Sequence, residues 1–195
     1  MKILLTGFEP FGSHRSNISW EVARLLQAEA RSGCDVRSLM LPVSYERAWK
    51  ELKRELIGGQ YDCVLMLGLA AKRTDICLER LAINIDDADM ADNDGIQRSG
   101  MLIERESPAA YFTTLPIIQM REVLNGQGYH VKISNNAGSY VCNHLYFQAL
   151  HWAKLQENAP EMGFVHLPDN KTDLMNENLY KTMSSAIEFL AADFK

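Results

Sequence analysis

The chain has 195 residues, of which 47% are hydrophobic and 23% charged, the ordinary balance of a globular protein. This length suffices for one sizeable hydrophobic core and is short for two, so we expect a single domain over residues 1–195. The formal net charge is −5 and no run of lysine and arginine stands out. Nucleic acid and anionic membrane surfaces are therefore poor candidates for partners.

The beginning of the chain does not resemble a targeting signal. Its apolar run covers only residues 3–6, whereas the hydrophobic region of a secretory signal has about 7–15 residues. No segment approaches the roughly 20 apolar residues of a membrane span. The chain is therefore expected to be cytoplasmic, and Cys34, Cys63 and Cys77, which form no CxxC pair, to be buried thiols.

Short apolar runs alternate with longer amphipathic stretches in the first half of the chain. The run over 61–70 is continuous, which is typical of a strand buried on both faces. In chain order the boundary residues predict a strand over 2–7, a helix capped by Asn17 or Ser19, a strand over 34–42, a helix from Ser44 to Gly58, the strand over 61–70 and another over 76–86.

The second half continues the alternation after a polar segment, 86–110, in which residues 101–106 are expected to form a short strand. Next come a helix over 115–126, a strand over 129–138, a helix over 139–156, a strand over 163–168 and a last helix that buries Leu179, Met183, Ala186, Ile187 and Leu190. This order predicts an α/β layered domain with a largely parallel sheet, whose ligands collect beyond the carboxyl ends of the strands.

Cys142 is a candidate nucleophile because it lies in the first turn of the helix predicted from residue 139. Backbone N–H groups and the helix dipole at such a position favour a thiolate. A purely structural cysteine also fits this position. His144 lies about 200° around the helix from Cys142, so it is expected to pack or hydrogen-bond elsewhere.

His166 is the lone polar side chain at the end of a buried strand, "GFVHLP", and is a candidate general base of near-neutral pKa. A core histidine bonded to the backbone is the alternative. Glu79 lies inside the apolar stretch "CLERLAIN" and is a candidate to orient a histidine. Its alternative is a structural ion pair with a lysine or arginine, because a buried carboxylate must be paired. No ligand-spaced pair predicts a metal site.

Six blocks of residues, in the same order along the chain, resemble the pyroglutamyl peptidase I (pyrrolidone-carboxylate peptidase) family of cysteine peptidases. These blocks are "LLTGFEPFG", "NISW", "ERLAINIDDADMADNDG", "PAAYFTTLPI", "AGSYVCNHL" and "GFVHLP". The resemblance implies a three-layer α/β/α sandwich with a mixed, largely parallel sheet, a homotetramer without cofactor or metal, and removal of N-terminal pyroglutamate from peptides.

By the same resemblance, Cys142 would be the nucleophile, His166 the base and Glu79 the group that orients it. The residues that would line the substrate pocket are Phe8, Phe11, Val43, Leu69, Met90, Tyr140 and Val141. An apolar, aromatic pocket suits an uncharged five-membered lactam. In strand-end positions the same residues also fit an ordinary core.

Asp89 departs from the family pattern, in which many members have an arginine that is thought to support the oxyanion. A carboxylate cannot donate a hydrogen bond there, and loss of one such donor typically costs about 10²–10³ in turnover. Arg80, or backbone N–H groups at the start of the helix, would have to replace it. Asp89 therefore favours one alternative, a homologue that binds pyroglutamyl-capped peptides without useful turnover. A separate alternative is a thiol amidase that acts on another small lactam or acyl group.

Overall fold

In the part of the chain that the structure describes, a computed structural model of residues 1–29, 33–169 and 173–193, a six-stranded mixed sheet forms the middle layer. Its strands are β1 (Lys2–Phe8), β2 (Asp35–Leu41), β3 (Cys63–Ala70), β4 (Ile76–Glu79), β7 (Val131–Ser134) and β8 (Glu161–Pro168). The spatial order is β2-β1-β3-β8-β4-β7. The first four strands in this order run parallel, whereas β4 pairs antiparallel with β8. The prediction of a mixed, largely parallel sheet is confirmed.

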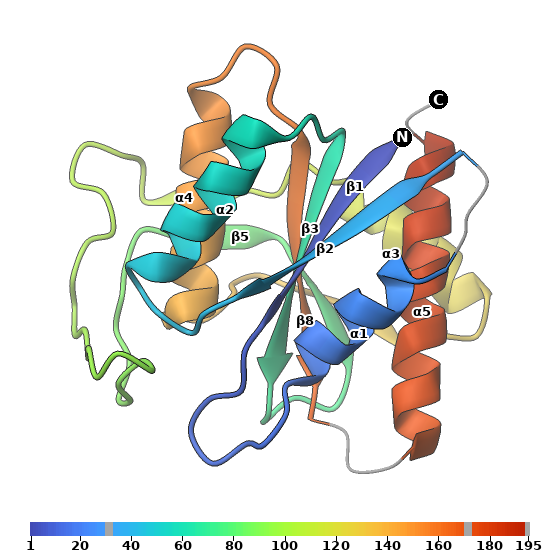
Figure 1. The fold of residues 1–195 in the computed structure, drawn as a ribbon, viewed down its shortest axis with the longest axis horizontal. Coiled ribbons are helices and arrows are strands. Elements are labelled where there is room, and N and C mark those ends of the chain that lie inside the picture. Colours follow the sequence, from blue (N-terminus) through green and yellow to red (C-terminus); the bar gives the residue numbers. More distant parts are fainter. Residues whose placement is uncertain (30–32, 170–172, 194–195) are drawn as a thin grey trace.

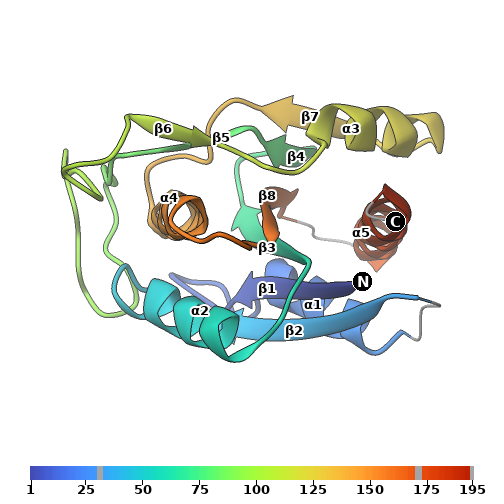
Figure 2. The same cartoon turned by 90° about the horizontal axis from the view of Figure 1, so that it is seen from above.

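Helices cover both faces of this sheet. They are α1 (Ile18–Gln27), α2 (Arg47–Gly58), α3 (Ile117–Gly126), α4 (Val141–Lys154) and α5 (Asp173–Asp193). Helices α1, α3 and α5 lie on one face and α2 and α4 on the other, on opposite sides of the sheet in Figure 1. A small antiparallel sheet of β5 (Leu81–Ile83) and β6 (Ala110–Phe112) packs against α4, as the view from above shows (Figure 2). The three-layer sandwich is confirmed.

Successive side chains of β3 point to opposite faces of the sheet, and both faces are buried, so the sequence of this strand is apolar throughout. Leu65 and Leu67 pack into the core under α1, α3 and α5, whereas Val64 and Met66 pack into the core under α2 and α4. Every residue from Cys63 to Leu69 is buried. A strand with helices on both faces has no polar face to present, so alternation is absent from its sequence.

Two strand predictions are wrong. The stretch 76–86 is not one strand, because the chain leaves the central sheet after Glu79 and enters the small sheet at Leu81. Between them, the Arg80 N–H bonds the carbonyl of Ser134 while the Arg80 carbonyl accepts from Thr113. Residues 101–106 do not form a strand either, since only Met101 pairs, in an isolated bridge with Asp86.

Helix starts lie close to their predicted positions. Asn17 caps α1, with its side chain accepting from the Ser19 N–H. Helix α2 begins at Arg47, three residues after Ser44, and the Ser44 side chain accepts a hydrogen bond from the Arg47 N–H at 3.0 Å. Helix α4 begins at Val141, two residues later than predicted, because Tyr140 is still extended (φ −103°, ψ −167°).

Candidate active site

Cys142 is the second residue of α4 and so lies in its first turn, as predicted. The chain reaches this helix from β7 through Gly138, whose φ of +84° belongs to the left-handed region that favours glycine. The first intrahelical bond runs from the His144 N–H to the Tyr140 carbonyl. The N–H groups of the preceding turn therefore have no partner within the helix and point toward its N-terminal end.

The Cys142 sulfur lies directly over Gly68 of β3. A methyl group at Gly68 would lie 3.1 Å from Cys142 Sγ and 2.7 Å from Phe164 Cζ, so only glycine leaves this space open. Gly68 pairs with His166 in the register between β3 and β8. Paired residues on neighbouring strands, which lie about 4.8 Å apart, share one face of the sheet. The sulfur and the His166 imidazole are thus brought together on the α2/α4 face.

Glu79 and His166 form a direct hydrogen bond, with 2.7 Å between Glu79 Oε1 and His166 Nδ1. Glu79 lies on β4 and His166 on β8, and these neighbouring strands run antiparallel. Their register places Glu79 opposite Phe164, two residues before His166. A carboxylate only accepts, so His166 Nδ1 carries the proton and Nε2 is left as the basic nitrogen. Glu79 has no exposed surface, and the Tyr146 hydroxyl donates to its backbone carbonyl at 3.2 Å.

Arg73 is the residue that sequence reasoning did not name. Its Nη1 donates to Glu79 Oε1 at 2.5 Å, and its Nη2 bonds Ser134 Oγ and the Asn136 carbonyl at 3.3 Å each. Glu79 therefore takes part both in the bond to a histidine and in the ion pair with an arginine, the two roles that its sequence position had left as alternatives. The signal was present, since a buried carboxylate requires a cation, but the five intervening residues of loop and strand hid which one.

Burial and charge set the protonation states of the pair. Burial first, and then the charge of Glu79, raise the pKa of the Cys142 thiol to about 12. The charge of Arg73 and a backbone hydrogen bond at the helix start lower this pKa, but by less than burial and Glu79 raise it. Burial lowers the pKa of His166, although the hydrogen bond that it donates to Glu79 opposes this, and the positive charge of Arg73 lowers it further. Both shifts favour the uncharged form of each group, the thiol and the neutral imidazole.

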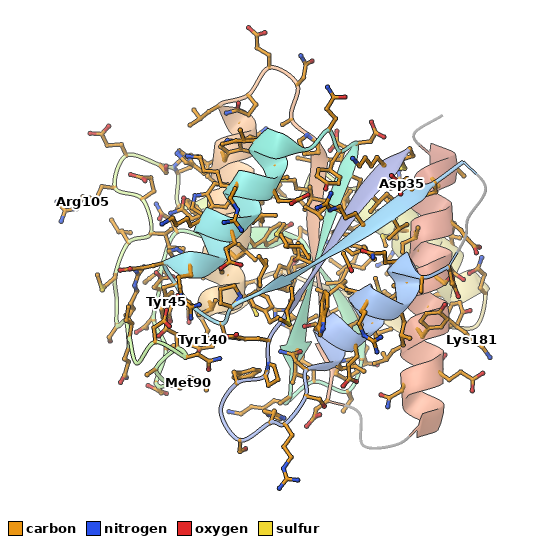
Figure 3. The ribbon with its side chains drawn as sticks, in the orientation of Figure 1. Asp35, Tyr45, Met90, Arg105, Tyr140 and Lys181 are labelled. Carbon is orange, nitrogen blue, oxygen red and sulfur yellow. The ribbon has the colours of Figure 1, made fainter. Side chains whose placement is uncertain are left out.

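The expected pocket residues gather mainly around one core. Phe8, Val43 and Val141 are buried in the cluster under α2 and α4, and Phe11, Tyr140 and Cys142 pack against its edge. Leu69 follows Gly68 on β3 and is 8% exposed. Met90 is 43% exposed on the loop that follows β5. Figure 3 shows Met90, Tyr140 and Tyr45 in the same region of the molecule.

The two residues considered for the oxyanion lie in different segments of the chain. Asp89 is exposed on the same loop as Met90. Arg80 directly follows Glu79 and lines a hollow on the surface together with Phe112, Ile118 and Gln119. His144 binds Asp86 through Nδ1 at 2.8 Å, as its expected role in hydrogen bonding predicts.

Within the described residues, no group of three histidine, cysteine or acidic side chains converges as a metal site would require. No helix in that part of the chain is long and apolar enough to cross a membrane. Cys63 and Cys77 are buried, as expected, and Cys34 is half-buried.

Comparison with known proteins agrees with this geometry. The family model described as pyroglutamyl peptidase matches residues 1–189. A pyrrolidone-carboxylate peptidase from Chromobacterium violaceum is 42% identical over 166 residues, which is 85% of this chain and 77% of that protein. Its counterpart from Thermococcus litoralis is 38% identical over 176 residues, covering 90% of this chain and 80% of its own length.

Solved structures give the same result. Pyroglutamyl peptidase I from Bacillus amyloliquefaciens superimposes with a TM-score of 0.91 at 32% identity, over 98% of this chain and 97% of that one. A mutant pyrrolidone carboxyl peptidase from Pyrococcus furiosus gives 0.93 at 30% identity, over the full length of both chains. The sequence matches and the shared fold together show that this chain belongs to the pyroglutamyl peptidase family.

Proposed function

We propose that this protein is a cysteine exopeptidase that hydrolyses the N-terminal pyroglutamyl residue from peptides through an acyl-enzyme on Cys142. The observation that carries the proposal is the alignment of Glu79, His166 and the Cys142 sulfur on one face of the sheet. Such an arrangement of nucleophile, base and orienting group is the general pattern of nucleophilic catalysis. The names of the relatives supply the substrate class.

The reaction begins from neutral partners. His166 Nε2 takes the thiol proton as Cys142 Sγ attacks the carbonyl carbon of the pyroglutamyl residue. The imidazolium then gives this proton to the leaving amine, and the C–N bond breaks to leave a thioester. Water, deprotonated by the same imidazole, attacks the thioester and releases pyroglutamate, and the proton returns to the sulfur. Glu79 and Arg73 hold the imidazole in the tautomer that this sequence requires.

Backbone N–H groups at the start of α4 are the proposed support for the oxyanion. They lie beside the nucleophile and have no partner within the helix. Asp89 and Arg80 have no part in this proposal, since one is an exposed carboxylate and the other lines a different hollow.

Phe8, Phe11, Val43, Leu69, Met90, Tyr140 and Val141 are proposed to line the lactam pocket. Their apolar surface favours a ring that carries no charge. Peptides with N-terminal pyroglutamate are the proposed partners. A homotetramer and a cytoplasmic location are also proposed, on the family resemblance alone, and light scattering and cell fractionation would test them.

Hydrolysis of a chromogenic pyroglutamyl amide tests the proposal directly. The wild-type protein should release the chromophore between about pH 6 and 8.5, and Cys142→Ala should release none while keeping its fold. No cleavage by the wild type would contradict the proposal. Binding without cleavage, rescued by Asp89→Arg, would instead identify a binding homologue, and cleavage of other small lactams or acyl amides alone would identify a different thiol amidase.

A further inference from the structure

A second histidine–carboxylate–arginine group lies two residues along α4 from the nucleophile, and the proposed reaction does not use it. Asp86 has no exposed surface, and its Oδ2 accepts from His144 Nδ1 and from Arg98 Nη1, each at 2.8 Å. A buried carboxylate is costly unless donors of this kind neutralise it. The three side chains, here called the Asp86 clamp, therefore depend on one another, because loss of either donor would leave the buried charge of Asp86 less well neutralised.

The Asp86 clamp closes the neck of a loop. The Asp86 N–H bonds the Met101 carbonyl at 2.7 Å and the Met101 N–H bonds the Asp86 carbonyl at 3.0 Å, so the two ends of loop 86–101 meet at the clamp. Inside the neck, the Ala88 N–H bonds the Arg98 carbonyl at 3.0 Å. His144 fastens this neck to α4.

The clamp also reaches the proposed pocket through an aromatic contact. The Arg98 guanidinium lies 4.6 Å above the centroid of the Tyr45 ring, a cation–π distance. The Tyr45 ring meets Tyr140 edge-on, with 5.7 Å between centroids, and His144 in the same way at 5.5 Å. In Figure 3, Tyr45 and Tyr140 lie beside each other at the loop that carries Met90. Tyr140 precedes α4 and the nucleophile.

Beyond its neck, loop 86–101 is bonded to three other chain segments that carry proposed pocket residues. The Tyr140 hydroxyl donates to the Ala91 carbonyl at 2.9 Å. The Asn93 N–H donates to the Val43 carbonyl at 2.9 Å. Asn93 Nδ2 donates to Glu9 Oε1 at 2.8 Å, and Glu9 lies between Phe8 and Phe11 in the sequence. The loop thus holds together three separate segments of the proposed pocket.

We propose that Arg98 is a positioning residue that, through Asp86 and His144, holds loop 86–101 in place and thereby determines affinity for the pyroglutamyl ring. This inference rests on the proposed function, and it concerns binding rather than the chemical step. When the loop is already ordered in its ligand-bound conformation, less conformational entropy is lost on substrate binding. This lowers KM and leaves kcat nearly unchanged. Without Arg98, the charge of Asp86 keeps only His144 as a donor, and the neck loses its cation.

Replacement of Arg98 by methionine tests this role. Arg98→Met should raise KM for a pyroglutamyl amide and Kd for the bare lactam 2-pyrrolidone about tenfold, with kcat within about twofold of wild type. Proteases should also nick loop 86–101 faster. Arg98→Lys, which keeps the charge, should recover most of the affinity. Arg105→Met is the matched control, because Arg105 is exposed in the same polar segment (Figure 3) and should behave as wild type.

Unchanged KM, Kd and nicking in Arg98→Met would overturn the inference, as would a fall in kcat equal to the fall in kcat/KM. If that variant does not fold, His144→Phe removes one donor but keeps an aromatic ring against Tyr45, and the same two outcomes apply to it. A wild-type chain that neither binds the lactam nor cleaves the amide would overturn the proposed function. The nicking rates would still decide whether Arg98 holds the loop.

Discussion

Replacement of Gly68 by alanine is the sharpest steric test of the site. The added Cβ would lie 3.1 Å from Cys142 Sγ, 2.7 Å from Phe164 Cζ and 2.8 Å from Phe164 Cε1, whereas ordinary contacts begin at 3.4 Å. The sulfur must therefore move by a few tenths of an ångström, and the phenyl ring by more. Phe164 in turn packs against His166, with 4.8 Å between ring centroids. Both proposed reacting groups are displaced by one methyl group.

The expected loss of activity is large for so small a substitution. Misplacement of reacting groups by about 1 Å costs about 10²-fold in rate, so we expect kcat for a pyroglutamyl amide to fall between about 10- and 100-fold. Overpacking of a core typically costs about 1–3 kcal/mol of stability. Steady-state kinetics and thermal unfolding measure the two effects separately.

Gly163→Ala is the matched control for this substitution. Gly163 is also a buried strand glycine, and its added Cβ would lie 2.3 Å from Leu115 Cδ1. Leu115 belongs to the core on the opposite face of the sheet from Cys142. We expect Gly163→Ala to lose stability with far less change in kcat. Equal losses of kcat in the two variants, or full activity in Gly68→Ala, would refute the placement of the sulfur over Gly68.

Three further predictions concern charge and hydrogen bonding. Arg73→Gln removes a positive charge that lowers the pKa of His166, so the acid limb of the kcat/KM profile should move to higher pH; an unmoved limb would contradict this. Because the pKa of the Cys142 thiol is raised to about 12, its alkylation by iodoacetamide, followed by peptide mapping, should still accelerate above about pH 9, and a plateau below neutral pH would be inconsistent. Tyr140→Phe removes the bond to the Ala91 carbonyl and should raise KM about fivefold, corresponding to about 1 kcal/mol, with kcat retained; an unchanged KM would count against a role for this bond.

Local sequence rules predicted most elements, and their errors lie where pairing with distant segments decides whether a strand forms. Apolar runs and helix boundaries identified the strands of the central sheet because burial on both faces leaves a simple pattern. The break at Arg80 was missed, since the residues on either side of it are equally apolar and the change of sheet is decided by bonds to Ser134 and Thr113, far along the chain. The short strand β6 was missed for the same reason, because it exists only through its pairing with β5.

The site shows the same division between local and distant information. The place of Cys142 in a helix start follows from its neighbours in the sequence, and so does the unusual burial of Glu79. The raised pKa of the Cys142 thiol does not, because desolvation and the charge of Glu79 depend on segments brought together by the fold. Arg73 and the Asp86 clamp escaped notice because each joins residues that are separated by loops of irregular length.

Trapping of the acyl-enzyme tests the proposed role of Cys142 most directly. The wild-type protein, mixed with excess pyroglutamyl amide and quenched in acid within the first turnovers, should carry the mass of one pyroglutamyl group on the peptide that contains Cys142. His166→Ala should accumulate little of this adduct, because the base that activates the thiol is absent. Substrate cleavage without any adduct on Cys142, or an adduct on another cysteine, would contradict the assignment of Cys142 as the nucleophile.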